Sequence, residues 1–356
     1  MEKAYLVLSN GAVFEGKRIG APAPTVGELV FTTGMAGYLE TLTDPSYAGQ
    51  IIVQTFPLIG NYGVIPEDFE GAPAAKGYVV RELCDTPSNF RSRGRLEDFL
   101  TEHGICGLCG VDTREITRII RESGVMNAAI CESVPESLEE IESFAVKGVV
   151  PQVSCREKHV CPAEGEKRYS VAMLDYGVKR GIVENLQRLG CEVTVYPQST
   201  TAEEILAANP DGIALSNGPG DPEENTFCIE QLRRLIGKKP MFGVCLGHQL
   251  VALAMGGRTM KLKYGHRGTN QPVREVLGQR TFITSQNHGY AVISDSLRGV
   301  GQEIFVNAND QSCEGMAYPG LDCFTVQFHP EARSGPHDTA FLFERFVDMM
   351  GGREHA

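Results

Sequence analysis

The order of hydrophobic and polar residues changes character part-way along the chain. Up to about residue 150, short apolar runs and single amphipathic helices are separated by irregular turns. From residue 168 onward, apolar runs alternate regularly with amphipathic helices. Polar sequence broken by prolines lies between the two halves. The pattern predicts two domains, at residues 1–150 and 168–356, joined by a linker at 151–167.

The first half combines strand and helix signals. Asn10 and Gly11 separate the apolar runs 5–8 and 12–14, which predicts a β-hairpin with a two-residue turn. A helix is predicted over residues 112–124, because an aspartate stands at its cap position, isoleucines form one face and a glycine ends it. This half is therefore expected to form a mixed α/β domain.

The second half has the periodicity of an α/β fold. The apolar runs predict strands at 171–174, 193–196 and 212–215. The amphipathic segments between and after them predict helices at 178–189 and 202–208. Such alternation is typical of a parallel sheet with helices on both faces, as in flavodoxin-like folds. Ligands bind these folds at the carboxyl ends of the strands.

Composition and charge narrow the class of protein. The chain has 356 residues, 42% of them hydrophobic, and a net charge of −12 without any basic run. Clustered lysine and arginine are needed to bind phosphate backbones, so nucleic acid is not an expected partner. Apolar stretches stay shorter than the roughly 20 residues that span a bilayer, and the first residues do not resemble a signal peptide. A cytoplasmic protein without membrane contact is therefore expected.

Eleven cysteines are scattered along the chain, as is typical of reduced thiols. Cys106 and Cys109 form the one CxxC pair, but a second pair with suitable spacing for zinc is missing, and no thioredoxin-like pattern surrounds them. The sequence therefore predicts no metal site in this chain. It leaves the role of these two cysteines open.

Cys245 differs from the other cysteines in its surroundings. Gly243 and Gly247 flank it at the point where an apolar run gives way to a helical pattern, which is the arrangement of a nucleophile elbow. A thiol at a helix N-terminus is favoured as thiolate by the unpaired N–H groups there. The alternative is a small buried apolar residue, the usual state of a cysteine. The context favours a nucleophile.

His329 and Glu331 provide a possible base for this thiol. They are two residues apart, so on an extended segment they share one face, and the carboxylate can orient the imidazole. Alone, His329 could equally be a structural histidine with satisfied hydrogen bonds. Together with Cys245 the pair indicates a cysteine hydrolase.

The segment 215–222 follows a predicted strand and contains alternating glycine and proline. Such a loop exposes backbone N–H groups that can stabilise the oxyanion formed when a thiolate attacks an amide. An ordinary strand-to-helix turn is the alternative. A phosphate-binding loop is a less suitable interpretation of this segment, because the Lys-Ser/Thr pair that ends such loops is missing.

These motifs together resemble the class I (triad) glutamine amidotransferases. The segments 263–270 and 286–290 resemble, within that class, the glutaminase subunit of carbamoyl-phosphate synthetase. The first half is similar to that subunit's own N-terminal domain, and the resemblance covers nearly the whole chain in order. In the first half, five segments show this resemblance: 27–38, 42–47, 59–63, 88–91 and 111–114.

The resemblance implies roles for individual residues. Cys245 would be the nucleophile, His329 the general base and acid, and Glu331 the residue that orients it. The backbone N–H groups of Leu246 and Gly218 would bind the oxyanion. The glutamine pocket would be formed by these two residues with Ser46, Gly220, Gln249, Asn287, Gly289 and Tyr290.

The resemblance also implies partners. The substrate would be L-glutamine, and the ammonia would pass to a large ATP-dependent synthetase subunit in a heterodimer or higher assembly. No cofactor is expected in this chain, because it lacks a Walker motif; ATP and divalent metal would belong to the large subunit. Arginine and pyrimidine synthesis both stay open as the use of the carbamoyl phosphate. A stand-alone thiol hydrolase of γ-glutamyl compounds and an inactive regulatory subunit are the rival hypotheses.

Overall fold

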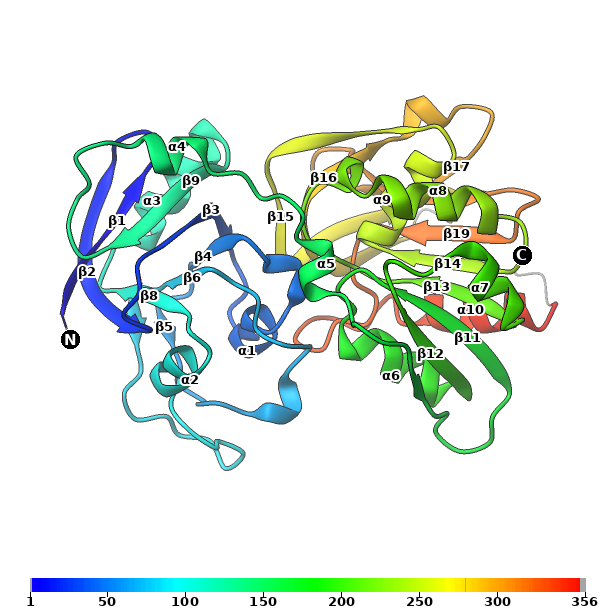
Figure 1. Ribbon diagram of the computed structural model, residues 1–356, viewed down its shortest axis with the longest axis horizontal. Coiled ribbons are helices and arrows are strands. Elements are labelled where there is room, and N and C mark those ends of the chain that lie inside the picture. Colours follow the sequence, from blue (N-terminus) through cyan, green and yellow to red (C-terminus); the bar gives the residue numbers. More distant parts are fainter. Residues whose placement is uncertain (1, 279, 353–356) are drawn as a thin grey trace. The chain divides into compact units, whose positions relative to one another are not determined.

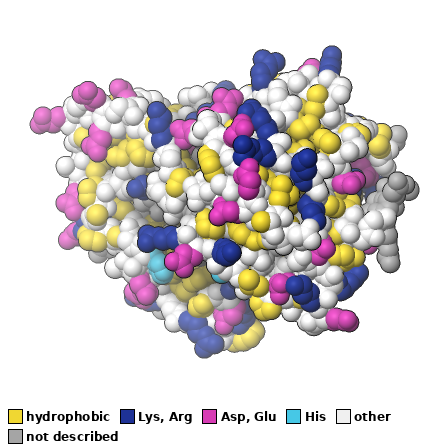
Figure 2. All heavy atoms as spheres, turned by 45° about the vertical axis from the view of Figure 1, so that its right-hand side comes forward, with side chains coloured by type: hydrophobic (Ala, Val, Ile, Leu, Met, Phe, Trp, Pro, Cys, Tyr) yellow, Lys and Arg dark blue, Asp and Glu magenta, His cyan; other side chains and the backbone are white. Residues whose placement is uncertain are grey.

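The computed structural model describes residues 2–278 and 280–352. The chain forms two compact units, Met1–Lys147 and Gly148–Ala356. Acidic and basic side chains are interspersed on the face shown in Figure 2. Within the described residues, no helix combines the length and the apolar character needed to cross a membrane.

The first unit is built around a closed β-barrel. Its strands are β1 (Lys3–Leu8), β2 (Val13–Gly20), β3 (Thr25–Thr32), β4 (Gln50–Gln54), β6 (Gly77–Val79), β8 (Cys106–Cys109) and β9 (Met126–Cys131). They follow the order β1, β2, β8, β6, β4, β3, β9, and β9 pairs with β1 to close the barrel. A separate pair consists of β5 (Leu58–Ile59) and β7 (Glu82–Leu83). Closure leaves the barrel without exposed strand edges.

Short helices complete this unit, which is mixed α/β as predicted. They are α1 (Tyr38–Leu42), α2 (Leu96–Glu102), α3 (Thr113–Ser123) and α4 (Glu139–Ser143). The expected hairpin is confirmed, since β1 and β2 pair antiparallel, but the predicted two-residue turn is wrong: Leu8 pairs with Ala12, so the loop has three residues and ends at Gly11, which has φ 87°. The expected helix cap is confirmed too: the Asp112 side chain accepts hydrogen bonds from the N–H groups of Arg114 and Glu115.

The second unit contains one large sheet. Its strands are β10 (His159–Cys161), β11 (Tyr169–Asp175), β12 (Cys191–Pro197), β13 (Gly212–Leu215), β14 (Met241–Val244), β15 (Arg258–Glu275), β16 (Thr281–Ile293), β17 (Gln302–Asn307), β18 (Cys313–Tyr318) and β19 (Cys323–Val326). The parallel part has the order β12, β11, β13, β14, β19. This is the strand order of flavodoxin-like folds, so the predicted fold class is confirmed.

Helices cover both faces of this sheet (Figure 1). They are α6 (Arg180–Arg188), α7 (Ala202–Ala207), α8 (Thr226–Leu235), α9 (Leu246–Ala254) and α10 (Phe341–Met350). The alternation of buried residues along β11 divides the core: Ala172 and Leu174 pack with α7, α8 and α9, whereas Val171 and Met173 pack with α6 and α10. The period-2 pattern of the strands thus assigns each helix to one face.

The segment 151–167 is more structured than a linker. It begins within a short helix, α5 (Val150–Val153), and contains β10, which pairs antiparallel with β12 at the edge of the sheet. Residues 148–167 belong to the second unit. Pro151 lies in the first turn of α5, where a helix does not use the N–H group that proline lacks, and Pro162 directly follows β10.

Candidate active site

Cys245 lies in a sharp turn between β14 and α9. Its backbone has φ 52° and ψ −102°, a conformation that non-glycine residues rarely adopt. The two flanking glycines make the turn possible. A Cβ atom on Gly243 would lie 3.0 Å from the carbonyl carbon of Gly247, and one on Gly247 would lie 2.6 Å from Cβ of Leu215. The structure therefore has the strained strand-to-helix turn of a nucleophile elbow.

Gly247→Ala is expected to lower the free energy of unfolding by about 1–3 kcal/mol, because the new methyl group overlaps Leu215 in a packed core. Calorimetric thermal unfolding measures the loss. Gly94→Ala is the control, since nothing lies within 4 Å of the added atom there. A Gly247→Ala melting temperature equal to that of the parent would contradict this account of the turn.

His329 and Glu331 follow β19, which lies next to β14 in the sheet. The N–H group of His329 donates to the carbonyl oxygen of Ser285 in β16, and this bond fixes the backbone of the loop. Nδ1 of His329 lies 2.7 Å from Oε1 of Glu331. Since a carboxylate accepts, Nδ1 carries the proton and Nε2 is left to act as a base.

Lys179 is a further charged neighbour of this pair that sequence analysis did not select. Its Nζ lies 3.3 Å from Nδ1 of His329 and 3.6 Å from Oε1 of Glu331. Lys179 follows β11, at the same carboxyl edge of the sheet as Cys245. This position after a predicted strand could have identified Lys179 from the sequence, because ligands of such sheets bind at this edge.

Electrostatics favour the protonated imidazole. Burial and the charge of Lys179 lower the pKa of His329, but Glu331 and Cys245 outweigh them and raise it to about 10. Burial opposes ionisation of Glu331, yet the charges of His329 and Lys179 hold the pKa of its carboxyl below the usual value. Nε2 of His329 makes no hydrogen bond of ordinary geometry to a described residue, although the thiol is close enough to affect the pKa. The site thus supports the imidazolium that forms when His329 takes a proton.

Gln327 is a second neighbour that sequence analysis missed. Its Nε2 donates to Sγ of Cys245 at 3.6 Å, and its Oε1 accepts from Nε2 of Gln249 at 3.0 Å. An N–H donor on sulfur stabilises a thiolate more than a thiol. The signal was present in the sequence, since residues 327, 329 and 331 have the period-2 spacing of one strand face.

Gln327→Leu is expected to reduce the rate at which Cys245 is alkylated at pH 7 by about tenfold or more. The reason is the loss of a hydrogen bond to a charged group, which is worth about 1.5–3 kcal/mol. Mass spectrometry of the peptide that contains Cys245, after timed exposure to iodoacetamide, measures the rate. Gln302→Leu, at an exposed position on β17, is the control. Equal alkylation rates in both variants would show that Gln327 does not act on the sulfur.

The two predicted oxyanion residues lie against each other. A Cβ atom on Gly218 would be 2.6 Å from Cδ2 of Leu246 and 2.3 Å from the carbonyl oxygen of Tyr176. The N–H group of Gly247 donates to the carbonyl oxygen of Ser216, which ties the loop after β13 to the start of α9. The contact around Gly218 leaves no space for a side chain. Backbone groups of both loops therefore meet beside the thiol-bearing turn.

Several predicted pocket residues of the second unit also gather near Cys245. The Cys245 thiol donates to the carbonyl oxygen of Asn287 at 3.8 Å. Nε2 of Gln249 donates to the carbonyl oxygen of Tyr290 at 2.9 Å as well as to Gln327. Both N–H donors of Gln249 are thus used inside the protein, which leaves its carbonyl oxygen for a ligand. Gly289 lies between Asn287 and Tyr290 on β16.

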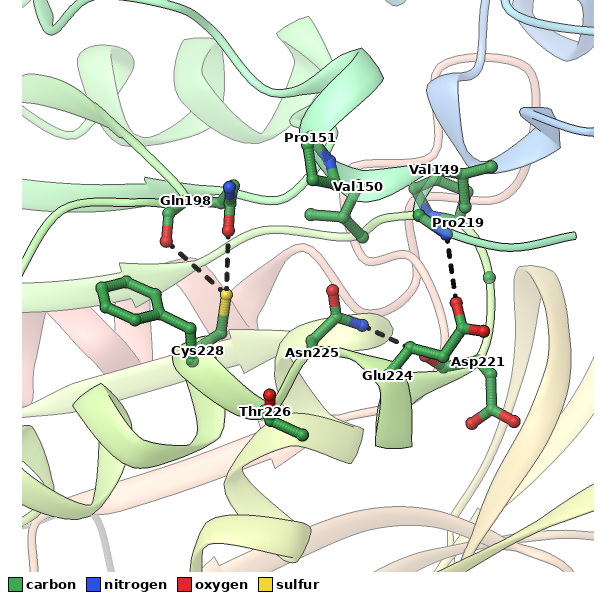
Figure 3. A pocket seen from close by; sticks show the side chains of 13 residues that line it. Val149, Val150, Pro151, Gln198, Pro219, Asp221, Glu224, Asn225, Thr226 and Cys228 are labelled. Carbon is green, nitrogen blue, oxygen red and sulfur yellow. Dashed lines mark hydrogen bonds between the residues drawn. The ribbon is translucent and has the colours of Figure 1, made fainter.

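Gly220 lies beside a pocket of about 140 Å³ (Figure 3). Gly220 has φ 85°, and Glu224 on the same rim accepts a hydrogen bond from the N–H group of Gly148. Cys228 donates to Gln198 on another wall. The lining of this pocket includes neither Cys245 nor His329, so it is separate from the reactive groups.

Ser46 belongs to the first unit. It lies in the short 3₁₀ helix Pro45–Tyr47, and its N–H group donates to the carboxylate of Asp44. Ser46 is buried. The role of Ser46 in binding glutamine stays a prediction.

Family models match both halves of the chain. The model of the carbamoyl-phosphate synthase small chain, CPSase domain, matches residues 6–130. The model of the class I glutamine amidotransferases matches residues 172–349, the segment that contains Cys245, His329 and Glu331. Each match falls within one compact unit.

Whole-chain relatives lead to the same family. Carbamoyl phosphate synthase small chains from Syntrophotalea carbinolica and Fusobacterium nucleatum are 47% and 49% identical to this chain, and each alignment covers 98% of both proteins. The protein of that name from Listeria monocytogenes is 48% identical, over 99% of this chain and 98% of the relative. The chain therefore belongs to the family of carbamoyl-phosphate synthase small chains, with a class I glutamine amidotransferase domain as its second half.

Proposed function

We propose that this chain is the glutaminase subunit of a glutamine-dependent carbamoyl-phosphate synthetase. It hydrolyses L-glutamine to glutamate and ammonia. The observation that carries the proposal is the position of Cys245, on a strained turn with the His329 and Glu331 pair and the Gln327 amide around it. These are a nucleophile, an oriented base and a donor that stabilises negative charge on sulfur.

The proposed reaction begins when Nε2 of His329 takes the proton of the Cys245 thiol. The thiolate attacks the side-chain carbonyl carbon of glutamine, and N–H groups of Leu246 and Gly218 stabilise the oxyanion. The carbon–nitrogen bond then breaks, and the nitrogen leaves as ammonia with the proton from His329. Water gives a proton to His329 and attacks the thioester, so the carbon–sulfur bond breaks and glutamate is released.

A large ATP-dependent subunit is the proposed acceptor of the ammonia. Glutamine hydrolysis needs no cofactor in this chain, so ATP and divalent metal are proposed to act in the large subunit. We place much of the interface on the first unit. Two large apolar side chains there, Met35 and Phe90, have 77% and 97% of their surface exposed, which suits a surface that becomes covered in a complex. Cytoplasmic location and a use in arginine or pyrimidine synthesis belong to the same proposal.

Glutamate release from glutamine tests this function. The purified chain is assayed alone and with a cognate large subunit, ATP and bicarbonate. Low activity alone and strong stimulation by the complete mixture are expected. High activity that is indifferent to the partner would overturn the subunit role and identify an independent thiol hydrolase instead.

A further inference from the structure

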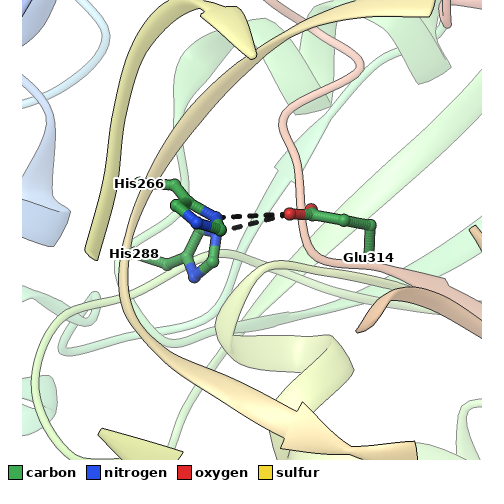
Figure 4. Close-up of side chains that lie close together, drawn as sticks. All are labelled: His266, His288 and Glu314. Atoms are coloured by element: carbon green, nitrogen blue, oxygen red, sulfur yellow. Dashed lines mark ion pairs between the residues drawn. The ribbon is translucent and has the colours of Figure 1, made fainter. Parts of the chain in front are cut away.

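A second cluster of reactive side chains lies in the long β15–β16 hairpin. His266 and His288 face each other across the two strands, and Glu314 of β18 reaches them (Figure 4). Nδ1 of His266 is 3.4 Å from Oε1 of Glu314, and Nε2 of His288 is 4.0 Å from the same oxygen. All three side chains are buried, with Glu314 fully inaccessible. The proposed glutamine hydrolysis uses none of them.

The outer hydrogen bonds decide where the imidazole protons lie. Nδ1 of His288 is 2.8 Å from the carbonyl oxygen of Tyr290, which can only accept, so Nδ1 carries the proton. Nε2 of His266 is 2.8 Å from a carboxylate oxygen of Asp310 and donates to it. Nε2 of His288 is therefore left with a lone pair. Against the effect of burial, Asp310 and Glu314 raise the pKa of His266 to about 9, so a metal ion at Nδ1 of His266 would take the place of a proton.

Buried acceptor atoms outnumber the donors beside Glu314. Oε2 of Glu314 is buried and has no hydrogen-bond partner among the residues that the structure describes. Oε1 of Gln286 lies 3.2 Å from Nε2 of His288, which adds one more acceptor. Asn307 does supply an N–H donor to Oε1 of Glu314 at 3.2 Å, but Oε2 stays without one. Buried acceptors that converge in this way favour a positive charge among them, either a proton on His266 or a metal ion.

We propose that His266, His288 and Glu314 bind one zinc-class divalent metal ion. Zinc in proteins takes imidazole nitrogen and carboxylate oxygen at roughly 2.0–2.2 Å, so neighbouring ligand atoms of a tetrahedral site are roughly 3.3 Å apart. The nitrogen–oxygen distances of 3.4 and 4.0 Å require only a small contraction. The side-chain oxygen Oε1 of Gln286, 3.2 Å from Nε2 of His288, is a candidate for a fourth ligand.

The hydrogen bonds of both histidines match those of metal ligands. Imidazoles that bind metal donate their second N–H to a carboxylate or a backbone carbonyl, and Asp310 and Tyr290 fill these two places. Because the ligands are buried, the ion would have a structural role. It would join β18 to the segment of β16 that carries Asn287 and Gly289, two residues of the predicted glutamine pocket.

Cobalt binding by the chelator-treated full chain tests this site. One equivalent of Co²⁺ is expected to bind with the visible absorption of a tetrahedral nitrogen and oxygen site, without thiolate charge-transfer bands. Zn²⁺ should displace it, and metal analysis should give one zinc per chain. In addition, the bound ion should raise the melting temperature.

Variants identify the ligands. Glu314→Gln is expected to weaken Co²⁺ binding at least about 100-fold. Asp310→Asn, on a loop, changes a residue that binds the His266 ligand rather than the metal, and it is expected to weaken Co²⁺ binding about 10–100-fold. His159→Asn, at an exposed position on β10, should bind as the parent does. Absence of binding by the parent would overturn the proposal and leave a protonated His266 between the two carboxylates. Thiolate bands, or equal affinity in all variants, would overturn it as well.

Discussion

Cys245→Ser is expected to abolish glutamine hydrolysis, with a loss of about 10⁴-fold or more in turnover. A serine hydroxyl is far less acidic than a thiol, and the sulfur is the atom that Gln327 contacts. Glutamate release by the complex measures the loss. Synthesis of carbamoyl phosphate from added ammonia should continue in the same complex, because the proposed acceptor site lies in the other subunit.

Cys161→Ser is the matched control for this change, because Cys161 is half-buried on edge strand β10 and takes no part in the site. It should retain the activity of the parent. If the Cys245→Ser complex still made carbamoyl phosphate from glutamine at the parental rate, the nucleophile would be another group. That result would support the rival hypothesis that this chain is an inactive regulatory subunit.

His329→Asn is expected to lower glutamine turnover by between about 10² and 10⁴-fold. Asparagine keeps polar atoms at this place but cannot carry a proton between sulfur, leaving nitrogen and water. The steady-state rate of glutamate release, measured from about pH 6 to about pH 11, gives the effect. Because the pKa of His329 is raised to about 10, the parental rate should fall as the pH rises through that value, and this alkaline limb should disappear in the variant.

The control for that variant is His159→Asn, which removes an exposed imidazole from the same unit. It should leave the rate and the pH dependence unchanged. A His329→Asn enzyme with a rate within about tenfold of the parent would contradict the assignment of His329 as the base. Lys179, the other titratable group beside Glu331, would then be the next candidate.

The second unit was largely predictable because its signals are local. The pattern of apolar runs and amphipathic helices predicts a parallel sheet, and the glycines around Cys245 predict the sharp turn at the carboxyl edge of β14. The first unit was predicted only as mixed α/β. Its barrel closes through the pairing of β1 with β9, strands more than a hundred residues apart in the sequence, and no local pattern encodes such a contact.

The parts of the site that were missed depend on tertiary packing. Lys179 and Gln327 reach Cys245 and His329 only because β11, β14 and β19 share one sheet edge. The histidine cluster was missed for another reason. His266 faces His288 through a hairpin whose register shifts at two bulges, and such shifts cannot be read from spacing.

The prediction of no metal in this chain considered only cysteine pairs. Cys106 and Cys109 lie on β8 in the barrel, where burial raises the pKa of both thiols, Cys106 to about 11. Such thiols are poor metal ligands at neutral pH. The histidine and carboxylate cluster in the second unit is a different kind of site, and its proposed metal can be tested independently of glutaminase activity.

Active-site labelling tests the central claim most directly. A chloroketone analogue of glutamine is incubated with the parent chain, and each cysteine-containing peptide is then weighed by mass spectrometry. The account predicts one adduct per chain, on Cys245 among the eleven cysteines, and protection by excess glutamine. Labelling of another cysteine, or labelling of Cys245 that glutamine does not slow, would contradict it.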